Sequence, residues 1–207
     1  MKTKKIITIA LAAAMVSASA LSVSAGTLTE TNTTGQTEDT ARIDGTTPVP
    51  GDVTYVITIP DVVDFGTLTQ PENADNDSFK DVEYSVSLTE VNNLDVATQK
   101  IAVYVRDQNA SVGNGEFKIT NKADSTKNFT YDIYDVLPAN INETTQSINA
   151  NTMSQAAGYK LCDFTTQGDA VDGTLRLNQT QLCGYDIADI VGEYNGYMVF
   201  QSLIENA

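Results

Sequence analysis

A run of alternating side chains begins the folded part of the chain, at residues 53–69. One face of this run carries the larger apolar residues Val53, Tyr55, Ile57 and Ile59, and threonines lie on the other face. Pro60 interrupts the alternation, which resumes at Val63 and Phe65. Strict alternation of β-branched and aromatic residues indicates a half-buried strand. We therefore expect a first strand from Val53, broken at Pro60 and continued beyond it.

The same period of two recurs along the rest of the chain, with polar turn signals between the runs. The longest run extends from Phe79 to Val91. Each run is expected to turn one apolar face toward a core. The expected core faces are Val82, Tyr84, Val86 and Leu88; Ile101, Val103 and Val105; Phe117 and Ile119; Phe129, Tyr131 and Ile133; Tyr159 and Leu161; and Leu175 and Leu177.

Four stretches need separate interpretation. The residues 140–157 are polar and poor in branched side chains, which predicts a long loop with at most one helical turn. The strand at residues 174–183 is expected to continue through TLRLNQTQLC. The short run 186–191 fits a strand or a helical turn equally well. Alternation passes through residues 194–204 without a shift, which favours one continuous strand over a hairpin at Asn195-Gly196.

About eight to ten short strands with little helix are expected, all in one domain at residues 53–207. Many short alternating strands separated by turns are typical of an all-β fold, and we predict a Greek-key β-sandwich of the immunoglobulin-like or fimbrial-like kind.

The N-terminal residues have the three parts of a secretory signal peptide. A basic start, MKTKK, precedes an eleven-residue apolar run at 6–16 and small residues up to Ala25. We expect cleavage after Ala25 and a secreted, extracellular protein, with a retained anchor helix as the alternative. The Thr-rich residues 26–52 are expected to form a flexible tether, because they hold too few large apolar side chains to order themselves. A strand donated to a neighbouring subunit is the alternative.

Charge and composition exclude several classes of function. The chain has 12 Lys and Arg against 27 Asp and Glu, and removing three lysines with residues 1–25 leaves 9 against 27, a net charge of −18. Such a surface repels nucleic acids. The chain has no His, which removes the usual general base and the commonest transition-metal ligand. No enzymatic activity, catalytic residue or cofactor is predicted.

Two cysteines, Cys162 and Cys183, are predicted to form a disulfide, because an even count in a secreted chain favours pairing. This bond would close a loop of roughly 20 residues and stabilise the fold by about 3 kcal/mol. Two buried free thiols are the alternative.

Acidic loops offer the main candidate chemistry. Residues 73–77 and 107–111 have oxygen ligands at alternate positions, but both lack the glycine and the final carboxylate of an EF-hand loop. A looser calcium site therefore stays open, beside the simpler interpretation of solvated acidic loops. Paired carboxylates for glycoside hydrolysis occur only at the frequency that this composition produces, and there is no Trp for stacking on a sugar.

Two motifs resemble a known group of proteins. The first motif is Thr58-Ile59-Pro60-Asp61-Val62-Val63-Asp64-Phe65-Gly66. It resembles the opening TIPxxVDFG of secreted β-sandwich modules in Gram-positive surface proteins. Residues 192–200, GEYNGYMVF, resemble the last strand, GxYxGxxxF, of those modules and of fimbrial-type subunits. The resemblance implies a surface-exposed structural or adhesive module without catalytic residues. Its best-known members, the WxL-type wall-binding proteins, carry a Trp-x-Leu motif that this chain lacks.

The leading hypothesis is a non-enzymatic structural or adhesive interaction protein at the surface of a Gram-positive bacterium. Its partners would be other surface proteins, or glycans and matrix of the cell wall or host, with self-association an open question. The loops at 107–115 and 140–157 are the expected binding loops, because long polar loops on a rigid scaffold commonly carry function. The alternatives are a carbohydrate-binding or hydrolytic module that uses calcium and acidic residues, and a filament subunit. Exposed tyrosines beside two carboxylates would favour the first alternative.

Overall fold

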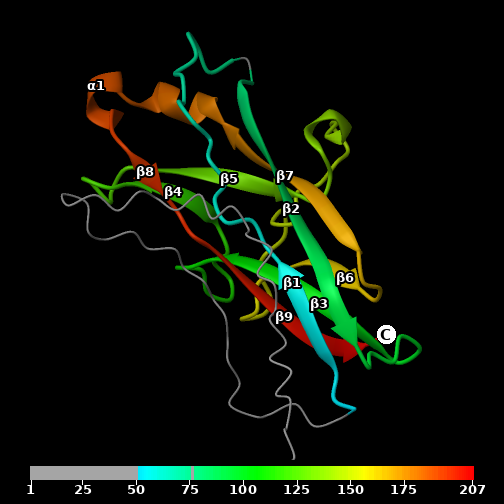
Figure 1. The fold of residues 1–207 in the computed structure, drawn as a ribbon. Helices are drawn as coiled ribbons and strands as arrows, with labels where there is room; N and C mark the ends of the chain where they lie inside the picture. The colour runs from blue at the N-terminus through cyan, green and yellow to red at the C-terminus, as the bar shows by residue number, and fades with distance from the viewer. Residues whose placement is uncertain (1–50, 76) are drawn as a thin grey trace, which may run out of the picture. The chain divides into compact units, whose positions relative to one another are not determined.

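The computed structural model describes residues 51–75 and 77–207, and within them the chain forms nine strands in two antiparallel sheets. Figure 1 shows the two layers. This confirms the predicted all-β, sandwich-like fold. The predicted signal peptide at 1–25 and almost all of the predicted tether at 26–52 lie outside the described residues.

The larger sheet has six strands in the order β1-β2-β7-β5-β4-β8. Neighbours in this order are mostly distant in sequence, so long-range pairing builds the sheet. Its strands are β1 (Thr54–Thr58), β2 (Phe79–Asn92), β4 (Phe117–Asn121), β5 (Asn128–Tyr134), β7 (Ala170–Asn178) and β8 (Tyr194–Asn195).

The smaller sheet has three strands in the order β6-β3-β9. They are β3 (Gln99–Asp107), β6 (Tyr159–Phe164) and β9 (Met198–Asn206). β3 and β9 pair without any shift in register, whereas the β3–β6 pairing has an irregularity between Val103 and Tyr104.

The core lies between the two sheets, where the predicted faces meet. In β2, Tyr84, Val86 and Leu88 are buried while the intervening residues are more exposed, as alternation requires. In β3, the predicted Ile101, Val103 and Val105 are buried. Further core residues include Phe117, Phe129, Ile133, Leu161, Leu175 and Leu177.

Pro60 ends the first strand as predicted, but the strand does not resume at Val63 and Phe65. The connecting segment is irregular and runs to β2. Phe65 is nevertheless buried, and its ring centroid lies 5.5 Å from that of Tyr131. The apolar residues of this segment therefore close one part of the core without forming a strand.

Three short helical segments occur in the described part of the chain: η1 (Pro138–Asn140), η2 (Gln179–Gly184) and α1 (Ile187–Ile190). The predicted continuation of a strand through residue 183 is wrong, because the Asn178 side chain accepts a hydrogen bond from the Thr180 amide and begins η2. α1 resolves the ambiguity at 186–191 in favour of a helical turn.

The predicted continuous strand at residues 194–204 is also wrong. β8 pairs with β4 in the larger sheet, whereas β9 pairs with β3 in the smaller one, so the chain changes sheets at Gly196. A Cβ atom at Gly196 would collide with the carbonyl oxygen of Lys118. Glycine at this position therefore allows the backbone of Lys118 to lie close by.

Candidate functional site

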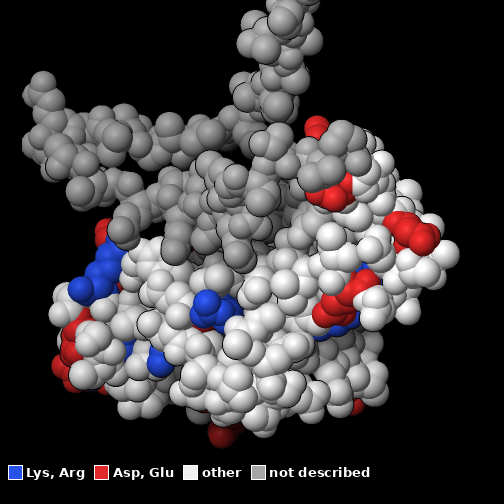
Figure 2. Space-filling view, turned by 90° about the horizontal axis from the view of Figure 1, so that it is seen from below, with Lys and Arg blue, Asp and Glu red and all other residues white. Residues whose placement is uncertain are grey.

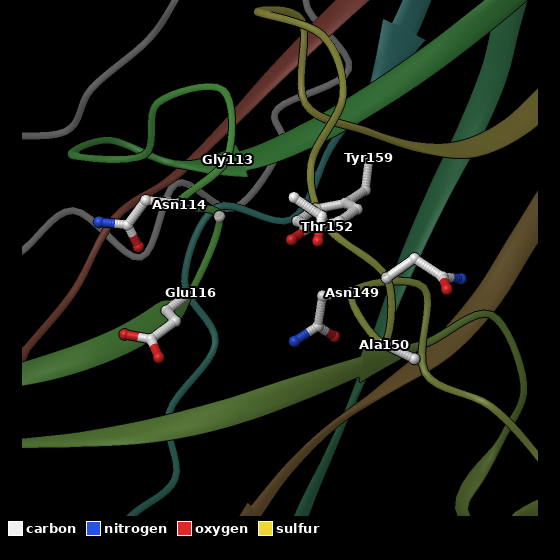
Figure 3. Close-up of a pocket in the computed structure, with 9 residues that line it drawn as sticks. Gly113, Asn114, Glu116, Asn149, Ala150, Thr152 and Tyr159 are labelled. Atoms are coloured by element: carbon white, nitrogen blue, oxygen red, sulfur yellow. The ribbon is translucent and has the colours of Figure 1, made fainter.

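The two loops singled out by sequence come together in a polar hollow of about 280 Å³. Figure 3 shows Asn114 and Glu116, from the β3–β4 connection, on one side and Asn149 and Ala150, from the β5–β6 connection, on the other. The described residues that line it are Gly113, Asn114, Gly115, Glu116, Asn149, Ala150, Asn151, Thr152 and Tyr159.

The first loop is held in a tight turn. The amide of Ser111 donates to the carbonyl of Asn114 at 2.9 Å, and the amide of Asn114 donates back at 2.8 Å. Gly113 has φ +86°, in the left-handed region that favours glycine. The amide of Gly113 also donates to the carbonyl of Met153 at 2.9 Å, which joins the two loops.

Met153 anchors the second loop. Its side chain is buried, with 1% of its surface exposed, although the loop around it is polar. A buried apolar side chain favours one loop conformation, because its exposure would lose hydrophobic stabilisation. The hollow is therefore formed by loops that are held in place.

Gly115 is buried and Tyr159 is half-buried, and the two lie against each other in the lining. A Cβ atom at Gly115 would collide with the Tyr159 ring and with Met153, so glycine allows the loop to approach the ring closely. The ring centroid of Tyr159 lies 5.9 Å from that of Phe117 in the core. Burial raises the pKa of Tyr159 and the Glu116 carboxylate adds to this rise, while a hydrogen bond with the Met153 backbone opposes it.

The lining offers amides and hydroxyls more than charges. Asn149 is already engaged, because its Oδ1 accepts from the Ile133 amide at 2.9 Å and its Nδ2 donates to Asp132 at 3.0 Å. The exposed side chains of Asn114, Asn151 and Thr152 make no hydrogen bond to a described residue. Glu116 supplies the one carboxylate among the lining residues. Such groups suit a neutral ligand that both donates and accepts hydrogen bonds.

Sequence reasoning selected the two loops by length and polarity but missed two lining residues: Glu116, which follows the first loop, and Tyr159, which was assigned to a strand. Tyr159 is the first residue of an edge strand, so its ring reaches both the core and the hollow. A tyrosine beside a polar loop was the available signal.

Among their described residues, the candidate calcium loops use polar side chains to cap local turns. Asp107 is buried and its carboxylate accepts from the Asn109 amide at 2.8 Å and from the Lys118 amide at 3.4 Å, so it organises a turn. At residues 73–77, the Asn73 side chain accepts from the Asp75 amide. Within residues 51–75 and 77–207, no group of three or more His, Cys, Asp or Glu side chains is placed to hold a metal ion.

The structure does not contain the predicted disulfide: Cys162 and Cys183 are both free thiols and are not at disulfide distance. Cys162 lies in β6 opposite Val103 of the smaller sheet, whereas Cys183 lies in η2, which follows β7 of the larger sheet. The Cys183 thiol instead lies 3.5 Å from the carbonyl oxygen of Pro71. Burial raises the pKa of the Cys162 thiol to about 12, and the neighbouring Asp163 carboxylate adds to the rise.

Most tyrosines in the described part of the chain serve the fold. Tyr84, Tyr104 and Tyr131 are buried, and Tyr185 is the most exposed, at 38%. They do not form an exposed stacking face beside two carboxylates, which counts against the carbohydrate-binding or hydrolytic module that uses calcium and acidic residues. No helix in residues 51–75 and 77–207 has the length and apolar character to cross a membrane.

Comparison with known proteins gives a distant likeness. No protein-family model matches the chain, and no curated protein matches it. A chain from a solved chaperone–tip adhesin complex of CFA/I fimbriae biogenesis is similar over 72% of this chain and 40% of its own length, with 13% identity and a TM-score of 0.37. This chain thus spans less than half of that relative. The resemblance to WxL-type modules stays a prediction.

Proposed function

We propose that the chain is a non-enzymatic adhesive module whose polar hollow binds a neutral glycan. The supporting observation is that two loops distant in sequence converge, through Gly113 and Met153, on one hollow at the rim of the sandwich. Binding residues are commonly carried on loops that a rigid scaffold positions.

The lining chemistry favours hydroxyl-rich ligands. Side-chain amides and hydroxyls both donate and accept hydrogen bonds, as sugar hydroxyls do. The volume of about 280 Å³ lies just below the usual range for ligand sites, which suits one sugar unit of a longer chain. Glu116 disfavours acidic sugars because it would repel a second carboxylate.

The number of carboxylates in the lining also favours a binding role over glycoside hydrolysis. Glycoside hydrolysis requires two carboxyl groups on either side of the bond, and Glu116 is the one carboxylate among the lining residues. The whole chain has no His to act as a general base or to activate a nucleophile.

The proposed place of action is the extracellular surface of a Gram-positive bacterium, based on the signal-like N-terminus and the two motifs. On the face shown in Figure 2, acidic and basic side chains are interspersed on a mostly uncharged surface. Such a surface suits contact with neutral polymers better than with nucleic acid.

The test is a screen of the purified protein on an array of neutral glycans, followed by titration calorimetry with a bound oligosaccharide. Thr152→Val and Asn151→Ala each remove polar groups that the fold does not use. Each is expected to weaken binding by about three- to tenfold, the cost of one hydrogen bond. Gln146→Ala, an exposed change in the same loop outside the hollow, is the control and should bind as the unaltered protein does.

The proposal fails if no neutral glycan binds, or if both hollow variants bind as tightly as the Gln146→Ala control. Binding that requires a cation and Glu116, but neither Asn151 nor Thr152, would indicate a ligand class other than neutral glycans.

A further inference from the structure

β9 lies at an edge of the smaller sheet, and half of its backbone groups are directed away from that sheet. The backbone amide of Ala207 donates to the carbonyl of Thr98, and the backbone amide of Gln108 donates to the carbonyl of Tyr197. Both pairs are directly opposite each other when the β3–β9 register is continued by one residue at each end. In an antiparallel ladder, such hydrogen-bonded pairs recur at every second residue. The odd-numbered residues of β9 therefore bond to β3, and the even-numbered residues direct their N–H and C=O groups outward.

These outward groups have no partner among the described residues. β9 pairs with β3 alone in the part of the chain that the structure describes. The neighbouring β1 contacts β9 through side chains, with the hydroxyls of Tyr55 and Ser202 3.0 Å apart, and this contact uses no backbone group of β9. Since no described residue pairs with this edge, its backbone groups can accept another strand.

β9 also lacks the features that protect the other sheet edges. Natural edge strands are usually short, bulged, or guarded by Lys or Pro. β1 has five residues and an irregularity at Val56/Ile57, β8 has two residues, and β6 has an irregular register and Lys160. β9 has nine residues, a regular register, and neither Lys nor Pro.

The side chains of β9 fit an apolar contact. Leu203 and Ile204 are 37% and 43% exposed although both are large and apolar. The one charged residue of the strand, Glu205, already pairs with Lys160 of β6 at 3.2 Å and accepts a hydrogen bond from Tyr104. Little uncompensated charge therefore opposes the approach of another strand.

We propose that β9 pairs antiparallel with β9 of a second copy of this chain, around a two-fold axis at Ser202. The outward, even-numbered residues then face each other across the axis, which places Phe200 opposite Ile204 of the second copy and Ser202 opposite its own counterpart. In this register Glu205 faces Val199, so no like charges are opposed. The two smaller sheets join into one continuous sheet.

A second copy of β9 fits this edge because, in this register, Phe200 meets Ile204 on each side of the axis and the single acid meets Val199. A closed two-fold contact of this kind uses both edges completely and stops at a dimer.

Light scattering after size-exclusion chromatography tests this proposal on the purified natural protein. The expected result is a concentration-dependent dimer. Ile204→Lys places a charge at the edge and is expected to weaken the dimer by at least about tenfold. Val191→Lys, a change at an apolar residue that is 76% exposed outside β9, is the matched control and should leave the dimer intact.

Amide hydrogen exchange on the unaltered protein gives a second readout that does not depend on a variant folding. The amides of Phe200, Ser202 and Ile204 are expected to become protected only at concentrations where the dimer forms, whereas those of Gln201 and Leu203 stay protected throughout. A monomer at every concentration overturns the proposal. The proposal is also overturned by a dimer that survives Ile204→Lys, or by a dimer in which the even-numbered amides of β9 stay unprotected.

Discussion

At the scale of single residues, Cys162 shows how burial decides chemistry. The raised pKa of its thiol, to about 12, means that the reactive thiolate is scarce in the folded protein at neutral pH. We expect native Cys162 to resist thiol reagents at pH 8, and its reaction to increase only as the pH approaches 12. In denaturant without reductant, both cysteines should react as thiols, because the fold keeps them apart.

The sign of the linked stability follows from the same shift. A pKa raised in the folded state stabilises the fold below the ordinary thiol pKa, about 8.5, and this contribution is lost as the pH rises toward 12. Mass spectrometry after alkylation at several pH values measures the reaction, with Cys162→Ser as the control. A Cys162–Cys183 disulfide in the purified protein would contradict the expectation.

At the scale of strands and helices, side-chain periodicity predicted much of the fold. The alternation in β2 identified Tyr84, Val86 and Leu88 as core residues because one face of that strand is buried. The end of β7 was missed because the local hydrogen bond of Asn178, rather than any apolar pattern, begins η2. The change of sheets at Gly196 was missed because alternation is unaltered when a chain passes from one sheet to the other.

The change of sheets at Gly196 gives a prediction about stability. Gly196→Ala would place a methyl group against the carbonyl oxygen of Lys118, and backbone cannot move aside as a flexible side chain can. We expect the free energy of unfolding to fall by about 1–3 kcal/mol, measured by denaturant titration. Gly184→Ala is the control, because a Cβ atom there meets nothing within 4 Å. It should change stability by less than about 0.5 kcal/mol. Equal effects of the two substitutions would show that β8 does not need the close approach.

At the scale of the whole molecule, the candidate site arises from topology. Length and polarity singled out the loops at 107–115 and 140–157, but their convergence depends on long-range pairing of β3 with β6 and on the buried Met153. No local pattern in the sequence contains that information. The same holds for the two cysteines, because Cys162 lies in β6 of the smaller sheet and Cys183 lies in η2, which follows β7 of the larger sheet.

Net charge gives the last prediction, because the chain carries −15 overall and repels itself at low ionic strength. Raising NaCl from about 0.01 M to about 0.15 M shortens the Debye length from about 30 Å to about 8 Å. The few surface ion pairs lose little by this screening, since exposed pairs contribute at most about 1 kcal/mol each. We therefore expect the melting temperature to rise with salt, as measured by calorimetry at low protein concentration.

A variant with less charge separates net repulsion from other effects of salt. Asp61→Asn, Glu72→Gln and Asp75→Asn, combined, remove three exposed charges from the irregular segment between β1 and β2. Because repulsion depends on the summed charge, the rise in melting temperature should be smaller in this variant, and its melting temperature at low salt should be higher. A melting temperature that falls with salt in both proteins would instead mean that specific ion pairs, such as Arg176–Asp81 with its 2.7 Å contact, outweigh the repulsion.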